Sequence, residues 1–317
     1  MSTVFLGTSE FAAAILQRLA RSDAFRPVLV LTRPDRPSGR GRRLASPPVA
    51  DCARALGIPF EQPDNVNDAA ARDLIARAAR PAKETPGAAG AGESSRQTVI
   101  VCAFGALIKE PLLSEHEMLN VHPSLLPRWR GAAPVERAIM AGDAHTGVSI
   151  MRLTAGLDSG PVCLAGGEPI GLEDTYGSLA ARLQELGGEL LVRALEQAPP
   201  FVEQNEAGVT YAEKIGAHDR VLDPSRPAVE LERVVRALEP HIGARVALAD
   251  GTLLGVHRAA IADESVGEGS GAVTAHDDRL LLACAPGVLE LLVVQPPGGK
   301  AMEASAYLRG HGAPGRA

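Results

Sequence analysis

The sequence predicts an α/β fold, with a Rossmann-like, mostly parallel sheet in an N-terminal domain and a small OB-like β-barrel after it. In the first half, short β-rich runs alternate with amphipathic stretches, which is typical of βαβ units. Beyond about residue 210, short alternating runs are separated by Asp-Gly and Asp-Asp pairs, which predict antiparallel hairpins. The predicted domains are residues 1–197 and 210–310, joined by a linker at 198–209.

The elements follow one another in a regular order along the first domain. The expected strands are 3–8, 27–32, 98–105 and 118–122, and the expected helices are 10–22, 47–57 and 70–80. The longest amphipathic segment, 174–197, predicts a helix with Asp174 as its N-cap. Residues 81–97 are rich in Pro, Gly, Ala and Ser, and predict a flexible surface insertion. In the second domain, 226–240 predicts a helix before the short strands.

Composition excludes several classes of protein. The chain has 317 residues, 45% of them hydrophobic, and its longest apolar runs are far shorter than the roughly 20 residues of a membrane span. The N-terminus has no basic region and predicts a first strand rather than a signal peptide. Four widely spaced cysteines support neither a zinc site nor a disulfide framework. We therefore expect a cytoplasmic protein with free thiols and no metal.

Charge leaves one basic segment to explain. The net charge of −6 argues against a protein that coats nucleic acid non-specifically. Residues 33–43, RPDRPSGRGRR, nevertheless hold five arginines against one acid, and their prolines and glycines make helix or strand unlikely. This segment is either a solvated loop or a loop that grips phosphates, for which the arginine fork is suited. Composition alone favours neither interpretation.

The segment from Asn120 to Val162 carries the clearest chemistry. Asn120 and His122 lie two residues apart in a predicted strand, so their side chains share one face. Asp158 follows in a glycine-flanked loop that can turn sharply. An amide, an imidazole and a carboxylate without a nucleophilic Ser or Cys elbow indicate direct group transfer, with a stabilised oxyanion and a moved proton. The LGTSEF turn has one glycine, too few for a dinucleotide fingerprint.

These residues resemble a known family, the folate-dependent formyltransferases. The resemblance lies in the Asn-x-His pair, SLLP, a downstream Thr-Gly and the Asp-Ser-Gly loop. The longer SLLPRWRGAAP, RPDRPSGRGRRL, TYAEKI and QPPGGKAM resemble the members of that family that act on methionyl-tRNA. The similarity runs from LGTSEF to about Leu308, and the 81–97 insertion departs from it.

The resemblance implies a reaction and its participants. The formyl donor would be 10-formyltetrahydrofolate, and the acceptor would be the α-amino group of methionine on initiator methionyl-tRNA, with no metal. Since the sequence shows no sign of an interface, we expect a monomer. The catalytic residues would be Asn120, His122 and Asp158. The folate would be bound by Ser124, Leu125, Leu126, Pro127, Ala103, Phe104 and Gly105, and the tRNA by Arg36, Arg40, Arg42 and Arg43.

Three other functions compete with this interpretation. A formyltransferase acting on a small amine, such as an amino-sugar nucleotide or glycinamide ribonucleotide, would use the same three residues but needs neither the arginine segment nor a second domain. A hydrolase could release formate from the same folate. A non-catalytic RNA-binding protein would have no reason to keep all three residues. One observation tells against a simple tRNA platform: residues 210–317 hold 11 Lys and Arg against 14 Asp and Glu.

Overall fold

The computed structural model describes residues 2–38, 43–78, 98–262 and 271–312. The predicted insertion at 81–97 lies outside the described residues. Two compact units are present, and they interleave along the sequence. The first consists of residues 1–130, 147–168 and 181–210, and the second of residues 131–146, 169–180 and 211–317. The predicted domain boundaries at 197 and 210 stay a prediction.

The first unit contains a seven-stranded sheet with the order β10-β9-β7-β6-β1-β2-β5. Strands β1, β2, β5, β6 and β7 run parallel, and β9 joins β7 antiparallel. The predicted mostly parallel sheet is confirmed. The strand bounds are Thr3–Gly7 (β1), Pro27–Leu31 (β2), Phe60–Glu61 (β5), Thr98–Cys102 (β6), Glu117–His122 (β7), His145–Arg152 (β9) and Val162–Pro169 (β10).

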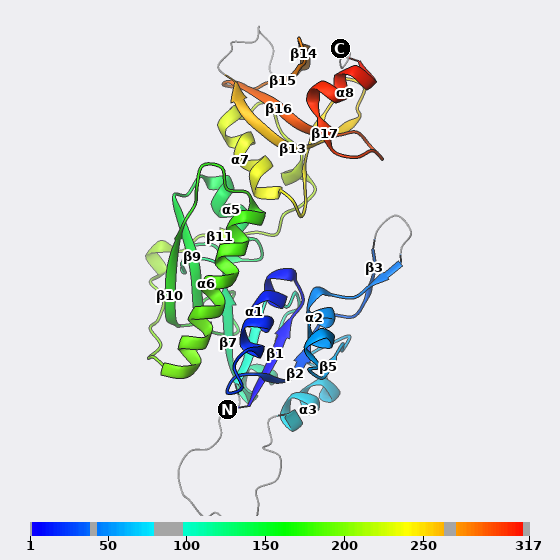
Figure 1. Ribbon diagram of the computed structural model, residues 1–317. Helices are drawn as coiled ribbons and strands as arrows, with labels where there is room; N and C mark the ends of the chain where they lie inside the picture. The colour runs from blue at the N-terminus through cyan, green and yellow to red at the C-terminus, as the bar shows by residue number, and fades with distance from the viewer. Residues whose placement is uncertain (1, 39–42, 79–97, 263–270, 313–317) are drawn as a thin grey trace, which may run out of the picture. The chain divides into compact units, whose positions relative to one another are not determined.

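Helices connect the parallel strands, as the alternating pattern predicted (Figure 1). Every residue of β1 and β6 is buried, which is the pattern of strands covered on both faces. Helix α1 begins after Ser9, whose hydroxyl accepts from the Ala12 amide at 3.3 Å. The helices are α1 (Glu10–Ala20), α2 (Pro48–Leu56), α3 (Ala69–Ala78), α4 (Leu112–Glu115) and α6 (Tyr176–Gln197).

The start of α6 differs from the prediction. The helix begins at Tyr176, and Thr175 Oγ1 accepts the hydrogen bond from the Ser178 amide at 3.3 Å. Asp174 instead closes the preceding turn, where its carboxylate accepts from the Gly171 amide at 2.7 Å and from the Ser178 hydroxyl at 2.7 Å. Asp174 as N-cap is therefore wrong, because a second capping residue stands directly after it and is the one whose oxygen reaches the helical amide.

The arginine-rich segment also differs from the prediction. Strand β3 (Arg36–Ser38) pairs antiparallel with β4 (Arg43–Ala45), although neither helix nor strand was expected there. Pro37 opposes Leu44 in this ribbon. A two-stranded ribbon consists of edge strands only, and an edge strand tolerates a residue without an amide donor. Proline content therefore excluded a central strand but not this one.

The second unit contains an antiparallel sheet of half-barrel form, which confirms the predicted fold class. The order is β12-β13-β16-β15-β14, with β17 paired to β16. The expected hairpins at Asp250-Gly251 and Asp277-Asp278 join β12 to β13 and β14 to β15. The bounds are Ala244–Ala247 (β12), Leu253–Ala262 (β13), Val273–His276 (β14), Arg279–Ala283 (β15), Val288–Gln295 (β16) and Met302–Glu303 (β17).

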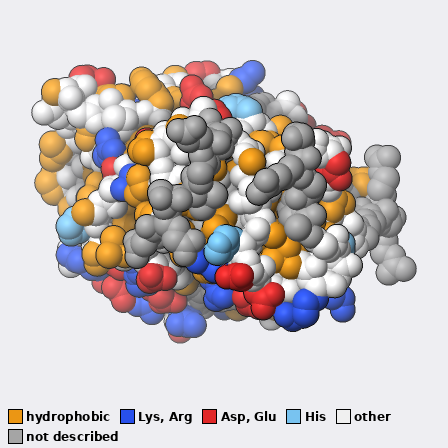
Figure 2. Space-filling view, turned by 90° about the horizontal axis from the view of Figure 1, so that it is seen from above, with side chains coloured by type: hydrophobic (Ala, Val, Ile, Leu, Met, Phe, Trp, Pro, Cys, Tyr) orange, Lys and Arg blue, Asp and Glu red, His pale blue; other side chains and the backbone are white. Residues whose placement is uncertain are grey.

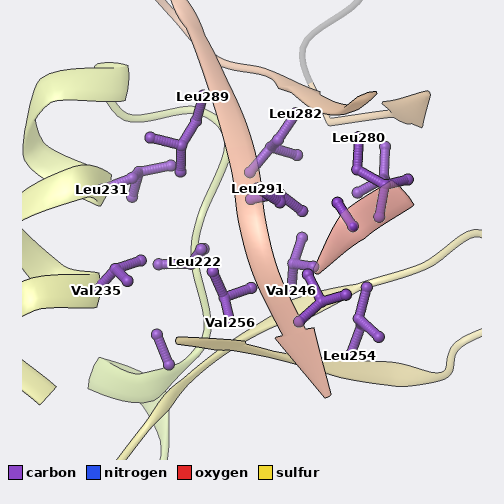
Figure 3. Packing of buried hydrophobic residues seen from close by; sticks show 14 of the residues in the cluster. Leu222, Leu231, Val235, Val246, Leu254, Val256, Leu280, Leu282, Leu289 and Leu291 are labelled. Atoms are coloured by element: carbon purple, nitrogen blue, oxygen red, sulfur yellow. The ribbon is translucent and has the colours of Figure 1, made fainter. Parts of the chain in front are cut away.

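One apolar core holds this unit together (Figure 3). Leu231 and Val235, one turn apart on α7, lie on the side that faces β16. Leu289 and Leu291 alternate along β16 and are fully buried, which is the spacing that places two residues on one face of a strand. The remaining elements are α5 (Pro134–Ala141), α7 (Ala228–Leu238), α8 (Ala304–His311), β8 (Arg130–Gly131), β11 (Tyr211–Ala212) and two 3₁₀ turns at Glu206–Gly208 and His218–Arg220.

An ion pair ties α5 to the segment that follows β11. Asp219 accepts from Arg137 Nη1 at 2.9 Å and Nη2 at 3.2 Å, and from the Gly216 amide at 2.8 Å. Partial burial of Asp219 raises the pKa of its carboxyl, but these hydrogen bonds outweigh burial and hold the pKa below its usual value. The charged form is therefore favoured by folding.

Replacing Asp219 with Asn should lower the stability of this unit at neutral pH. Because the folded-state pKa lies below the unfolded one, the contribution of Asp219 is present above about pH 4 and is lost as pH falls through the folded pKa. Thermal unfolding against pH should therefore bring the variant and the unsubstituted protein together in acid. Asp277→Asn, at a side chain 91% exposed, is the control. A destabilisation of Asp219→Asn that stayed constant down to pH 2 would contradict the linkage.

Candidate active site

Strand β7 delivers two polar side chains to the interior of the first unit. Asn120 and His122 are 8% and 4% exposed, and β7 lies between β6 and β9 in the sheet. Asn120 stands opposite Val101 of β6, and His122 stands opposite Ser149 of β9. The strand ends at His122, at the carboxyl edge where ligands of open α/β sheets bind.

The contacts of His122 fix its orientation. Its Nε2 lies 2.8 Å from the carbonyl oxygen of Trp129. A carbonyl only accepts, so Nε2 carries the hydrogen of this bond. The other ring nitrogen, Nδ1, lies 3.7 Å from Asp158 Oδ2. This is too long for a direct hydrogen bond but short enough for an ion pair when the ring is charged.

Asp158 reaches the imidazole from a loop far along the chain. The loop follows β9, and its base is closed by the Arg152 amide, which donates to Pro161 O at 2.9 Å. Asp158 has a φ of 43°, in the left-handed region that is uncommon for a residue with a side chain. Its side chain is 14% exposed. The fold therefore brings two of the three predicted catalytic residues, His122 and Asp158, into contact.

The carboxamide of Asn120 makes no side-chain hydrogen bond within the described part of the chain. Burying an amide without a hydrogen-bond partner destabilises the folded protein, because no hydrogen bond compensates for the lost contact with water. The same amide is not among the atoms cut off completely from solvent. It is therefore placed to donate to a molecule that enters from the strand edge.

The loop after β7 is organised by its own hydrogen bonds. Ser124 is fully buried, and its hydroxyl donates to Arg128 O at 2.7 Å, while its carbonyl accepts from Ser149 Oγ at 2.8 Å. The Trp129 amide donates to Thr210 Oγ1 at 2.9 Å. Leu125, Leu126 and Pro127, the other predicted folate residues of this loop, are half-buried. Ser124 therefore stabilises the loop from within, and the half-buried residues Leu125–Pro127 form the accessible part of the loop.

A pocket of about 420 Å³ lies at the carboxyl ends of β1, β2 and β6. Its lining includes the predicted folate residues Ala103–Gly105, with Ala103 and Gly105 exposed and Phe104 only 4% exposed. Phe104 O accepts from Thr8 Oγ1 at 2.7 Å, which fixes the turn after β6. The Phe104 side chain belongs to the core, so this turn can line the pocket only through its backbone and its small residues.

The predicted tRNA residues are described only in part. Arg36 is exposed on β3 and lines the pocket just described, as does Arg33. Arg43 begins β4, and Arg40 and Arg42 lie outside the described residues.

On the face drawn in Figure 2, acidic and basic side chains stand side by side along one edge. Among the side chains coloured there, no broad basic field gathers, in line with the acidic balance of residues 210–317.

Two residues at this site were missed by sequence reasoning. Gln204 Nε2 donates to Asp158 O at 2.8 Å and to Gly160 O at 2.7 Å. Gln204 Oε1 accepts from Nε of Arg130, a buried arginine, at 3.0 Å. The sequence carried no signal for this contact, because Gln204 stands in a stretch with the composition of a linker. That stretch in fact pairs with β10 through a Val162–Val202 bridge.

Metal-ligand clusters and membrane-spanning helices are both absent from the described residues. No group of three or more His, Cys, Asp or Glu side chains there could hold a metal ion. No helix in the same residues is long and apolar enough to cross a bilayer. Cys102, which ends β6 beside the pocket, is fully buried, and burial raises the pKa of its thiol. It therefore stays protonated and is a poor nucleophile.

Fold and site together define a class: a Rossmann-like enzyme with Asn120 and His122 at the end of one strand and Asp158 in a loop that reaches the imidazole. Residues 1–195 match the family described as formyl transferase, and residues 214–312 match its C-terminal domain. The chain belongs to the formyl transferase family.

Relatives match the chain almost from end to end. Methionyl-tRNA formyltransferase of Stenotrophomonas maltophilia is 42% identical, with 97% of each chain covered. The protein of the same name from Dechloromonas aromatica is 40% identical, covering 98% of this chain and 96% of its own. Identity therefore extends through both family domains.

Solved structures of more distant proteins share the fold. HypX from Aquifex aeolicus in complex with tetrahydrofolic acid is 17% identical with a TM-score of 0.60, covering 96% of this chain and 46% of its own. WlaRD, a sugar 3N-formyl transferase, is 14% identical with a TM-score of 0.61, covering 92% and 96%. At such identity the likeness concerns the fold alone.

Proposed function

We propose that this protein transfers the formyl group of 10-formyltetrahydrofolate to the α-amino group of methionine on initiator methionyl-tRNA. The observation that carries the proposal is the near-complete match to relatives named methionyl-tRNA formyltransferase, at 42% identity over 97% of the chain. The similarity to these relatives runs through both family domains, residues 1–195 and 214–312.

The reaction asks the site for two things. The neutral amine attacks the formyl carbon and a C–N bond forms, while the carbonyl oxygen takes the negative charge. The bond to the folate nitrogen then breaks, the amine gives up a proton, and the leaving nitrogen gains one. A free α-amino group titrates near about 8, so part of it is already neutral at pH 7. Oxyanion stabilisation and proton movement remain for the protein to supply.

Asn120 and His122 meet the first requirement. The Asn120 carboxamide is buried and has its N–H groups available, so it can donate to the oxyanion without first breaking another bond. His122 uses Nε2 to hold Trp129 O, so Nδ1 is its one nitrogen left for the substrate. In the charged ring, Nδ1–H donates to the oxyanion, and the Trp129 carbonyl keeps the ring from rotating.

Asp158 meets the second requirement. Its carboxylate lies 3.7 Å from His122 Nδ1, a separation that leaves room for a reacting group or a water to approach both. The carboxylate can accept the proton of the attacking amine and pass it to the leaving nitrogen. Catalytic hydrogen bonds are often long before substrate binds, so this distance fits the role.

The test is formyl transfer from 10-formyltetrahydrofolate to charged initiator methionyl-tRNA. Formylation of the charged tRNA, with none of uncharged tRNA or free methionine, is the expected result. Transfer to an amino-sugar nucleotide or glycinamide ribonucleotide instead would keep the folate site and overturn the tRNA assignment. Formate release with no acceptor would indicate a hydrolase. Binding of tRNA without any transfer would indicate the non-catalytic alternative.

Donor and acceptor binding should respond differently to salt. Contacts with tRNA phosphates release counterions, so the affinity for tRNA should fall steeply as salt rises. Folate carries far fewer charges than tRNA and meets two arginines, Arg33 and Arg36, in the pocket lining, so its affinity should change less. Titrations of each ligand at several salt concentrations measure both trends. Equal salt dependence of the two would remove the argument that the arginine segment binds phosphates.

A further inference from the structure

The loop that carries Asp158 is held by one side chain from a distant part of the chain. Both donor hydrogens of the Gln204 amide are used on this loop, toward Asp158 O at 2.8 Å and Gly160 O at 2.7 Å. Both carbonyls directly follow the left-handed position of Asp158, whose φ is 43°: one is its own and the other lies two residues further on. Such a conformation persists only when its surroundings enforce it, and the two hydrogen bonds from Gln204 are part of those surroundings.

Arg130 fixes which way the Gln204 amide points. Its guanidinium Nε donates to Gln204 Oε1 at 3.0 Å, and its Nη2 donates to Glu206 Oε1 at 2.9 Å. Arginine offers only donors, so the amide must turn its oxygen toward Arg130 and its NH₂ toward the loop. The Arg130 side chain is 4% exposed, which limits its freedom to swing away.

The same short segment also controls His122. Arg130 follows Trp129, whose carbonyl accepts from His122 Nε2 at 2.8 Å. The Arg130 amide donates to Thr210 O at 2.9 Å, and the Trp129 amide donates to Thr210 Oγ1 at 2.9 Å. Residues 204–210 therefore contact the backbone that orients the imidazole and the backbone that presents the carboxylate.

We propose that Gln204 is a positioning residue that sets the Asp158 carboxylate at its distance from His122. The proposal rests on the proposed function, since it concerns the geometry of that reaction. Displacement of a reacting group by about 1 Å can cost about 100-fold in rate. The alternative is a purely structural role, in which Gln204 anchors residues 198–210 through Arg130 and does not influence the position of Asp158.

Two substitutions separate these readings. Gln204→Glu keeps an oxygen for Arg130 but replaces both donors with acceptors, which the carbonyls of Asp158 and Gly160 cannot use. Gln204→Met removes donors and acceptor and adds no charge. If Gln204 positions Asp158, both variants should lower kcat about 10- to 100-fold, with KM for donor and tRNA little changed. If it only anchors Arg130, Gln204→Glu should keep its kcat, even where repulsion between its carboxylate and the two carbonyls lowers the melting temperature.

A double-mutant cycle with Asp158→Asn tests the route of the effect. Because Gln204 is proposed to act through Asp158, adding Gln204→Met to Asp158→Asn should cause little further loss of kcat. Full multiplication of the two losses would overturn the proposal. Gln197→Glu is the matched control, at an exposed glutamine that ends α6. It should leave kcat unchanged.

The outcomes also separate this inference from the proposed function. If the unsubstituted protein is active and its Gln204→Glu variant turns over at the same rate, the positioning role is contradicted and the proposed function is not affected. An unsubstituted protein that formylates no methionyl-tRNA would overturn the function and the inference that rests on it. A third outcome is that Gln204→Met loses melting temperature and kcat together while Gln204→Glu stays fully active. That result would support the anchoring role and contradict the positioning role.

Discussion

Replacing His122 with alanine is expected to lower the turnover number for formyl transfer by about two orders of magnitude or more. The ring is 4% exposed and is held by Trp129 O on one nitrogen and faces Asp158 with the other. In the proposed mechanism its removal takes away one donor to the oxyanion and leaves the Asp158 carboxylate without its ring partner. Losing one such donor typically costs on the order of 3 kcal/mol of barrier.

The turnover numbers of the companion variants Asn120→Ala and Asp158→Ala should fall by a similar factor, each for a different reason. In the proposed mechanism Asn120 contributes a neutral donor, so its loss should not change how the rate depends on pH. Asp158 is proposed to move a proton, so its loss should change that dependence. Single-turnover rates over a pH range, with donor and tRNA saturating, separate the two effects from binding.

The control for this series is His145→Ala, at an exposed residue that begins β9. It removes an imidazole from the surface and should leave turnover unchanged. Near-normal turnover in any of Asn120→Ala, His122→Ala or Asp158→Ala would remove that residue from the mechanism. Equal losses in the His145 variant would mean that the assay reports folding rather than chemistry.

Local patterns in the sequence were enough to predict the sheet and the strand that carries Asn120 and His122. Asn120 and His122 are two residues apart in one strand, and a period of two fixes their shared face wherever that strand packs. The alternation of buried strands and amphipathic helices predicted a mostly parallel sheet, because this order is typical of βαβ units. Hairpins at Asp250-Gly251 and Asp277-Asp278 were predicted because their turn chemistry is local.

What the sequence could not provide is the set of contacts between distant segments. Gln204 meets the Asp158 loop 46 residues away and Arg130 74 residues away, and no periodicity encodes either contact. Asp174 and Thr175 both suit an N-cap, and only the geometry decides between two adjacent candidates. The β3–β4 ribbon was missed because proline content was taken to exclude strands of every kind.

Gly160→Ala is expected to damage the site without touching a catalytic group. A Cβ at residue 160 would lie 1.9 Å from the carbonyl oxygen of Arg152, at the end of β9. That neighbour is backbone in a paired strand, so the loop must move instead. Gly160 O accepts one of the two Gln204 hydrogen bonds, and Asp158 stands two residues before it. Movement of the loop therefore displaces the carboxylate from His122.

The expected cost is about 1–3 kcal/mol of stability, as for overpacking elsewhere, and about a 100-fold loss of turnover. Thermal unfolding and single-turnover formylation measure the two effects. Gly156→Ala is the matched control in the same loop, since its Cβ would meet only the hydroxyl end of Ser159, which can rotate away. Normal turnover in Gly160→Ala would mean that the loop tolerates displacement. The 3.7 Å separation of His122 and Asp158 would then be incidental to catalysis, because a carboxylate that can move freely without loss of rate is not one whose position the reaction needs.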